Sequence, residues 1–320
     1  MRRPDVKVGS LAGALWGLDT VVLGMAMLLS PYSSLSQSFA FAALVAAFVH
    51  DAACAIWLFL YMGLKRRLSE TWKGLRTRSG LVVVFGALLG GPIGMTGYVI
   101  AINNIGAGYT AIISSLFPAF GALLAYILLK ERMSIPQLGA LVVAVLAVMA
   151  MGWFSAPITQ HGNTVLGMIG ALLTVLGWGA EGVLGDWGMT AGAVDNETAI
   201  QIRETVSALA YAAIVLPLFK AWPVALDVLP SKATLVVVLA GLAGAASYLT
   251  YYKAIDLIGA APSMALNISY SAWAVLFAFV LQGTVPSVIT IVCCVVVLGG
   301  SVFASCDWKD IFRHPSVSQE

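Results

Sequence analysis

The residues best suited to chemistry are two acids in apolar stretches, each three positions after a tryptophan. Glu181 follows Trp178, and Asp19 follows Trp16. Residues three apart lie on one face of a helix, so each indole is expected beside its carboxylate. A carboxylate inside a membrane costs about 2.5–3.5 kcal/mol on insertion scales, which makes it a functional candidate. Aromatic faces and carboxylates both attract cations, so these segments are candidate parts of a site for an organic cation.

Further aromatic residues extend this candidate site. Tyr248 and Tyr252 are four residues apart and are expected to share a helix face, with Tyr251 beside them. Tyr270 and Trp273 are three apart and form a second candidate wall. Tyrosine and tryptophan also anchor membrane helices at the interface. The interpretation therefore depends on the rings that lie deep in their segments and close to acids.

The acids also suggest proton transfer. Glu181 is either a counter-ion for the cation or a proton carrier, and one residue can combine the two roles. Asp19 is interpreted as its partner. His50 and Asp51, near the middle of another apolar stretch, are further candidates, because histidine titrates near neutral pH. The alternative for this pair is a polar contact that fixes helix packing. The proton-coupling candidates are therefore Glu181, Asp19, His50 and Asp51.

The composition indicates a membrane protein. Of 320 residues, 60% are hydrophobic and only 10% are charged, whereas soluble domains carry about 25% charged residues. The net charge of +2 does not favour nucleic-acid binding. The four cysteines and three histidines lack the spacing of metal ligands or of a catalytic centre. We therefore expect no metal, no cofactor and no enzymatic activity, and expect the lipid bilayer as the surroundings.

Apolar runs of about 20 residues predict an all-α integral membrane protein with ten transmembrane helices. They are expected at 8–30, 38–63, 80–102, 107–129, 135–154, 164–190, 197–220, 233–256, 262–282 and 286–305. Most lysines and arginines fall in the segments on one side of these spans. By the positive-inside rule, both termini are cytoplasmic, including a tail at 306–320. The expected location is the inner membrane of a bacterium.

The chain also repeats itself. Ala101-Ile102 with Ile105-Gly106-Ala107 returns 153 residues later as Ala254-Ile255 with Ile258-Gly259-Ala260. This predicts two five-helix repeats, at 1–157 and 158–305. Because five is odd, the repeats must be inverted, which is typical of transporters that bind substrate near the membrane midplane.

One span carries a cluster of helix-disturbing residues. Gly90, Gly91, Pro92 and Gly94 lie together inside the expected third span. Glycine and proline inside a helix favour a kink or hinge. A carrier that alternates access needs such a point, so these four residues are candidates for gating.

Several stretches resemble a known family. From about residue 10 to 305, the layout resembles the drug/metabolite transporter superfamily, in its EamA branch, and more closely the choline transporters of the LicB type. The resemblance is carried by Leu15–Leu18, His50-Asp51, Gly91–Met95, Gly177–Gly179 with Glu181, Ile202-Arg203, Ser247–Tyr252 and Asn267–Tyr270 with Trp273.

That resemblance implies proton-linked uptake of choline or a similar quaternary amine by alternating access. The matching positions imply an aromatic cage of Trp16, Trp178, Tyr248 and Tyr252, with Glu181 close by. Asp19 departs from the pattern and could change the substrate or the coupling. The alternative is an exporter of amino acids or other small metabolites or drugs with the same fold. The oligomeric state stays open, with a homodimer as one alternative.

Overall fold

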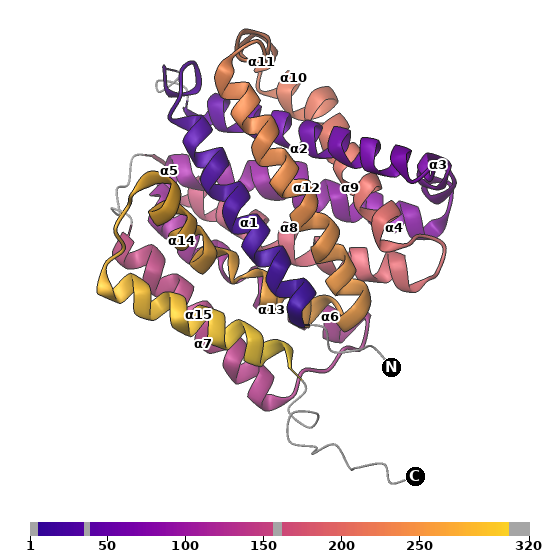
Figure 1. Ribbon diagram of the computed structural model, residues 1–320, viewed down its shortest axis with the longest axis vertical. Coiled ribbons are helices and arrows are strands. Elements are labelled where there is room, and N and C mark those ends of the chain that lie inside the picture. The colour runs from indigo at the N-terminus through magenta and orange to yellow at the C-terminus, as the bar shows by residue number, and fades with distance from the viewer. Residues whose placement is uncertain (1–5, 35–38, 156–161, 307–320) are drawn as a thin grey trace.

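The computed structural model describes residues 6–34, 39–155 and 162–306, and the described part of the chain is helical throughout (Figure 1). The elements are α1 (Val6–Met27), α2 (Phe39–Leu64), α3 (Leu68–Leu75), α4 (Arg78–Leu88), the π-helical η2 (Leu89–Met95), α5 (Thr96–Ser114), α6 (Phe117–Leu128), α7 (Ile135–Ser155), α8 (Thr164–Thr190), α9 (Asn196–Ala210), the π-helical η3 (Tyr211–Val215), α10 (Leu216–Leu218), α11 (Trp222–Val228), α12 (Lys232–Ile258), α13 (Ala260–Asn267), α14 (Tyr270–Gln282) and α15 (Val288–Ser305).

Nine helices in the described part are long and apolar enough to cross a membrane. The expected third and fourth spans account for the difference from ten. They form one 37-residue run, Arg78–Ser114, followed by the shorter apolar helix Phe117–Leu128. The run is broken at Gly106, whose φ of 81° is a conformation that glycine adopts without strain. The helix is kinked there, close to the expected boundary between the third and fourth spans.

The repeated sequence has a structural counterpart. Gly259 stands 153 residues after Gly106 and also has a positive φ, of 100°. In each half a second break follows nine residues later, at Ser115 and at Ile268. The helix contacts also correspond. α1 packs on α12 and α14, while α8 packs on α4–α5 and α6, and α7 packs on α15 (Figure 1). The same set of contacts therefore occurs twice, with the first helix of each half lying against the other half.

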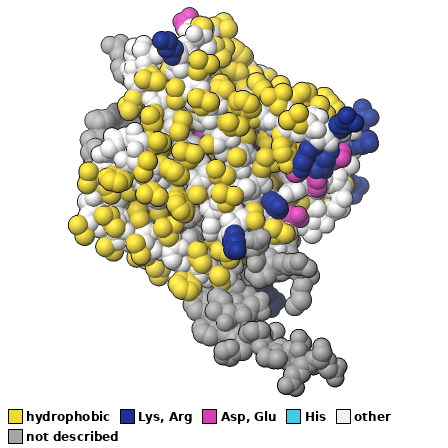
Figure 2. Space-filling view, in the orientation of Figure 1, with side chains coloured by type: hydrophobic (Ala, Val, Ile, Leu, Met, Phe, Trp, Pro, Cys, Tyr) yellow, Lys and Arg dark blue, Asp and Glu magenta, His cyan; other side chains and the backbone are white. Residues whose placement is uncertain are grey.

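Small residues allow this close packing. Gly9, Gly13 and Gly17 put one face of α1 directly against α13 and α14, since a Cβ at Gly17 would lie 2.7 Å from the Cβ of Trp273. The exposed surface is mainly leucine, valine, isoleucine and phenylalanine (Figure 2). Such a surface suits contact with lipid chains, and helices that meet inside a membrane need small residues to approach.

Basic side chains gather at one end of the helical bundle, where α3 lies (Figure 2). We call this the basic end. Arg67 there pairs with Glu70, Asp195 and Glu197, and Lys65 Nζ lies 2.5 Å from Glu197 Oε1. These ion pairs join the α2–α3 connection to the start of α9.

The pKa of the Asp195 carboxyl shows how this junction depends on pH. Partial burial raises its pKa, but hydrogen bonds from Arg67 and Thr198 outweigh burial and hold the pKa below its usual range. A lowered pKa means that the carboxylate stabilises the folded state above its unfolded pKa and loses this contribution as the pH falls. The junction therefore persists at neutral pH and weakens only in strong acid.

Candidate functional site

A cavity of about 400 Å³ lies in the middle of the bundle. Its walls come from both halves of the chain. The aromatic lining residues are Trp16, Tyr98, Phe117, Trp178, Tyr248, Tyr251 and Tyr270. The ionisable side chains in the lining, apart from tyrosine, are Asp19, His50, Asp51, Glu181 and Arg203. The size is within the range of small-molecule sites, and the lining combines ring faces with buried charge.

Five of these rings form one connected set of contacts. Trp16 stacks on Tyr270, with ring centroids 4.0 Å apart, and meets Trp178 edge-on at 6.2 Å. Trp178 in turn contacts Phe117 at 5.8 Å and Tyr98 at 5.3 Å. Trp16 thus meets Tyr270 and Trp178 meets Phe117, and these two partners are 153 residues apart in the sequence. The two halves supply matched ring pairs to one cavity.

Glu181 is paired with a cation of the protein itself. Arg203 on α9 donates to both carboxylate oxygens of Glu181, at 2.8 and 3.2 Å, and to Glu204 at 2.7 Å. Its guanidinium also lies 4.5 Å from the ring centre of Tyr248. Arg203 thus lines the central cavity and pairs with both Glu204 and Glu181.

Asp19 also has a different partner from the expected one. His50 Nε2 lies 3.0 Å from Asp19 Oδ1, and His50 Nδ1 lies 3.4 Å from Asp51 Oδ1. Ser207 donates to the other oxygen of Asp51 at 2.6 Å, and Arg203 lies 3.9 Å from that oxygen. His50 therefore connects two carboxylates that come from different helices. The structure brings all four predicted proton-coupling residues to one cavity.

Two of the predicted substrate residues lie elsewhere among the described residues. Tyr252 is buried behind the cavity, where its hydroxyl lies 3.5 Å from Glu181 Oε1. Trp273 packs against Gly17 of α1 and against Phe277, and it is not among the residues that line the cavity. The remaining seven, Trp16, Asp19, Trp178, Glu181, Tyr248, Tyr251 and Tyr270, line the cavity.

Sequence reasoning missed three lining residues that have clear roles. Tyr98 is the repeat partner of Tyr251, and Phe117 that of Tyr270, so the 153-residue offset could have revealed both. Arg203 belongs to one of the stretches that carry the family resemblance, but nothing in the sequence identifies Glu181 as its partner.

The predicted gating segment is π-helical and lies against the charged cluster. Pro92 lies inside η2, and the wider π-helical turn leaves room for it. A Cβ at Gly90 would lie 1.6 Å from Glu181 Oε2, and one at Gly91 would lie 2.1 Å from Ser207 Oγ. A Cβ at Gly94 would lie 3.1 Å from Cδ1 of Trp178. A side chain at these positions would crowd the residues of the site, so glycine allows η2 to pack closely against them.

Replacing Gly90 with alanine is therefore expected to displace the Glu181 carboxylate and to destabilise the fold by about 1–3 kcal/mol, since buried atoms in a packed core have little room to shift. The measurement is the thermal unfolding midpoint of the purified protein in detergent. Gly139→Ala is the matched control, because a Cβ there meets nothing within 4 Å. Equal midpoints for the two variants would contradict this account of Gly90.

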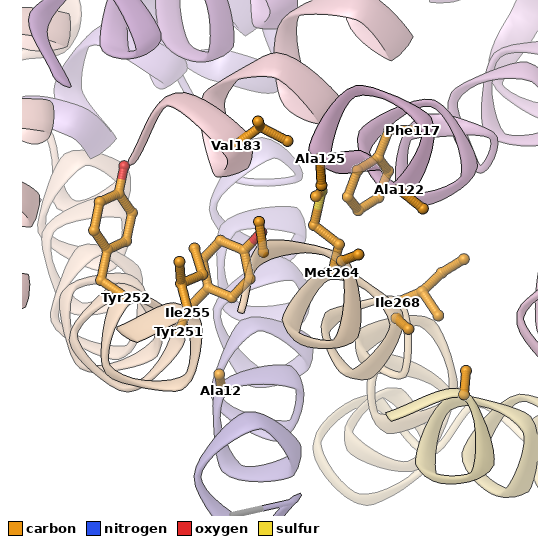
Figure 3. Packing of buried hydrophobic residues seen from close by; sticks show 14 of the residues in the cluster. Ala12, Phe117, Ala122, Ala125, Val183, Tyr251, Tyr252, Ile255, Met264 and Ile268 are labelled. Carbon is orange, nitrogen blue, oxygen red and sulfur yellow. The ribbon is translucent and has the colours of Figure 1, made fainter. Parts of the chain in front are cut away.

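The cavity extends away from the basic end. Its lining reaches Met27, Ala43 and Ile102, which lie toward the opposite end of the bundle. Val183, Tyr252, Ile255 and Met264 belong to the buried hydrophobic core (Figure 3). None of these four residues lines the cavity, whose lining reaches toward the opposite end of the bundle.

Comparison with known proteins agrees with this architecture. Residues 6–153 match the model of the "EamA-like transporter family". "Protein LicB" of Haemophilus influenzae is 30% identical over 272 residues, which are 83% of this chain and 85% of that protein. A solved structure, titled "Crystal structure of protein", superimposes with a TM-score of 0.67 at 19% identity, covering 94% of this chain and 96% of the other. At that identity the structural match shows the fold alone. The chain belongs to the EamA-like transporter family.

Proposed function

We propose that this transporter carries a small organic cation, choline or a similar quaternary amine, inward together with protons. The supporting observation is the cavity in which ring faces from both halves surround a cluster of buried carboxylates. A quaternary amine cannot lose its charge on leaving water. Ring faces that contribute about 0.5–2 kcal/mol each can replace part of its hydration.

The charges of the cluster favour a cation. Its buried acids are Asp19, Asp51, Glu181 and Glu204. The described basic residues that contact them are Arg203 and His50. If all four acids are ionised, their negative charges exceed the positive charges of Arg203 and a protonated His50. A bound cation, bound protons or both would balance this charge, which is the basis of the proposed coupling.

The direction follows from the orientation that we propose. Basic segments face the cytoplasm under the positive-inside rule, so the cavity would extend toward the outside of the inner membrane. The two repeats would be inverted, and exchange of their contacts would open the basic end. The membrane potential, negative inside, would favour inward movement of one charge by about 2.3 kcal/mol per 100 mV.

Export of amino acids is the alternative with a specific structural requirement. An amino-acid carrier needs a cation for the substrate carboxylate. Arg203 would be that cation, but it already contacts Glu181, Glu204 and Asp51. A substrate carboxylate would have to compete with these three acids, so the geometry favours a cationic substrate.

Uptake of labelled choline into proteoliposomes tests the proposal. We expect uptake to rise when the outside is acidified relative to the inside, and tetramethylammonium to inhibit it. The Asp19→Asn variant should lose the pH response, because Asp19 contacts His50 and has no arginine partner among the described residues, whereas Arg203 already neutralises Glu181.

The outcomes separate the candidates. An unchanged pH response in Asp19→Asn, with a lost response in Glu181→Gln, would move the proton site to Glu181. No uptake of any quaternary amine, with uptake of an amino acid, would reject the proposed substrate and leave the fold unaffected.

A further inference from the structure

Asn267 is a polar residue in the cavity wall that neither the cation cage nor the proton site uses. It ends α13, lines the cavity and is 93% buried, with 7% of its surface exposed. Its Oδ1 atom is buried and has no hydrogen-bond partner among the described residues. A buried amide oxygen without a partner costs about 1–3 kcal/mol, so such groups are rare and call for an explanation.

The position of Asn267 is fixed by the break between α13 and α14. The chain continues through Ile268 and Ser269 in a tight turn, where Ser269 N donates to Leu266 O and Ala272 N donates to Ser269 O. Residues three apart in such a turn eclipse each other. Asn267 therefore lies one turn before Tyr270, on the side that carries the Trp16–Tyr270 stack.

The matching position in the first half differs. Ser114 stands 153 residues before Asn267, and its hydroxyl donates to Ala111 O within its own helix at 3.3 Å. The aromatic rings of the two halves correspond, but this polar group does not. The Asn267 amide, with its unpaired Oδ1 atom, is therefore a polar group present on one wall only, and it can distinguish the two ends of an elongated cation.

We propose that Asn267 binds a hydroxyl group carried by the substrate cation, and so selects hydroxylated ammonium compounds over purely alkylated ones of the same shape. A hydroxyl both donates and accepts, so either end of the amide can pair with it. An alkyl group at the same place would leave the amide unpaired. This inference rests on the proposed cation transport and adds a second point of recognition to it.

The experiment compares two ligands that differ only in this group. Choline and n-propyltrimethylammonium have nearly the same shape, with a hydroxyl in one and a methyl in the other. Dissociation constants are measured by calorimetry on the purified full-length protein. We expect the wild type to bind choline about tenfold more tightly. Asn267→Leu should bind the two ligands equally while keeping its affinity for the propyl compound, which also shows that it is folded.

Two further variants complete the test. Asn267→Ser introduces the residue type that the first half has at the matching position, Ser114. This variant should also lose most of the preference for choline over the propyl compound. Ser114→Ala is the matched control and should keep it, because that hydroxyl is already paired within its helix.

Equal binding of the two ligands by the wild type would overturn the role of Asn267 and leave the aromatic cage intact. A preference that survives in both Asn267 variants would do the same. Failure of the wild type to bind either ligand would reject the proposed substrate class as well.

Discussion

Replacing Arg203 with glutamine is expected to abolish uptake and to lower the melting temperature of the protein. The guanidinium holds Glu181 through two hydrogen bonds and also contacts Glu204 and Asp51. Removing one partner of a buried ion pair costs about 3–5 kcal/mol, because it leaves charge buried without compensation. The measurements are the thermal unfolding midpoint in detergent and uptake into proteoliposomes.

A double variant separates the structural part of this effect from the transport part. Arg203→Gln combined with Glu181→Gln removes both members of the pair, so we expect it to recover a large share of the lost stability. Uptake should stay absent, because the cavity has lost its charge arrangement. Lys253→Gln, at an exposed position on α12, is the control and should leave both measurements near the wild type. A midpoint for Arg203→Gln equal to that control would contradict the pairing described above.

Replacing Trp178 with alanine is expected to raise the dissociation constant for choline about tenfold or more. Its indole contacts Trp16, Tyr98 and Phe117, so it joins the aromatic walls from the two halves. One ring face contributes about 0.5–2 kcal/mol to cation binding, and the neighbouring rings lose their support as well. Calorimetric titration of choline into the purified variant measures the change.

α8 offers a matched control for this experiment. Trp187 lies on the same helix but is 47% exposed on the outer surface. Trp187→Ala should bind choline as the wild type does. Trp178→Phe should retain an intermediate affinity, because it keeps a ring face at the cavity. If Trp178→Ala bound choline with unchanged affinity, the aromatic cage would be wrongly assigned, even though the fold would stand.

Much of the fold followed from local properties of the sequence. Apolar runs require helices in a membrane, because backbone groups there have no water to pair with. Gly106 and Gly259, which the repeated sequence relates, both have a positive φ in the structure. The number of helices was less certain, since one reversal occurs inside a continuous helical run. The arrangement as two inverted five-helix repeats stays a prediction.

The candidate site was predictable in its residue types and only in part in its contacts. Acids and deep aromatic rings inside apolar segments can be recognised in a sequence, because a charge in lipid is costly and such rings are unusual there. The sequence thus predicted Trp16, Trp178 and Glu181 as parts of one site, and the structure places all three in the lining of one cavity. Their partners depend on how helices far apart in the chain pack side by side.

Only the tertiary structure decided which charges meet. It placed Arg203 on Glu181 and His50 between Asp19 and Asp51, and it put Tyr252 behind the cavity. It also left the Asn267 amide in the cavity wall with its oxygen unpaired. Spacing along one helix fixes which side chains share a face, whereas an ion pair requires a second helix. The packing of small residues between helices sets that contact, and no local pattern in the sequence specifies it.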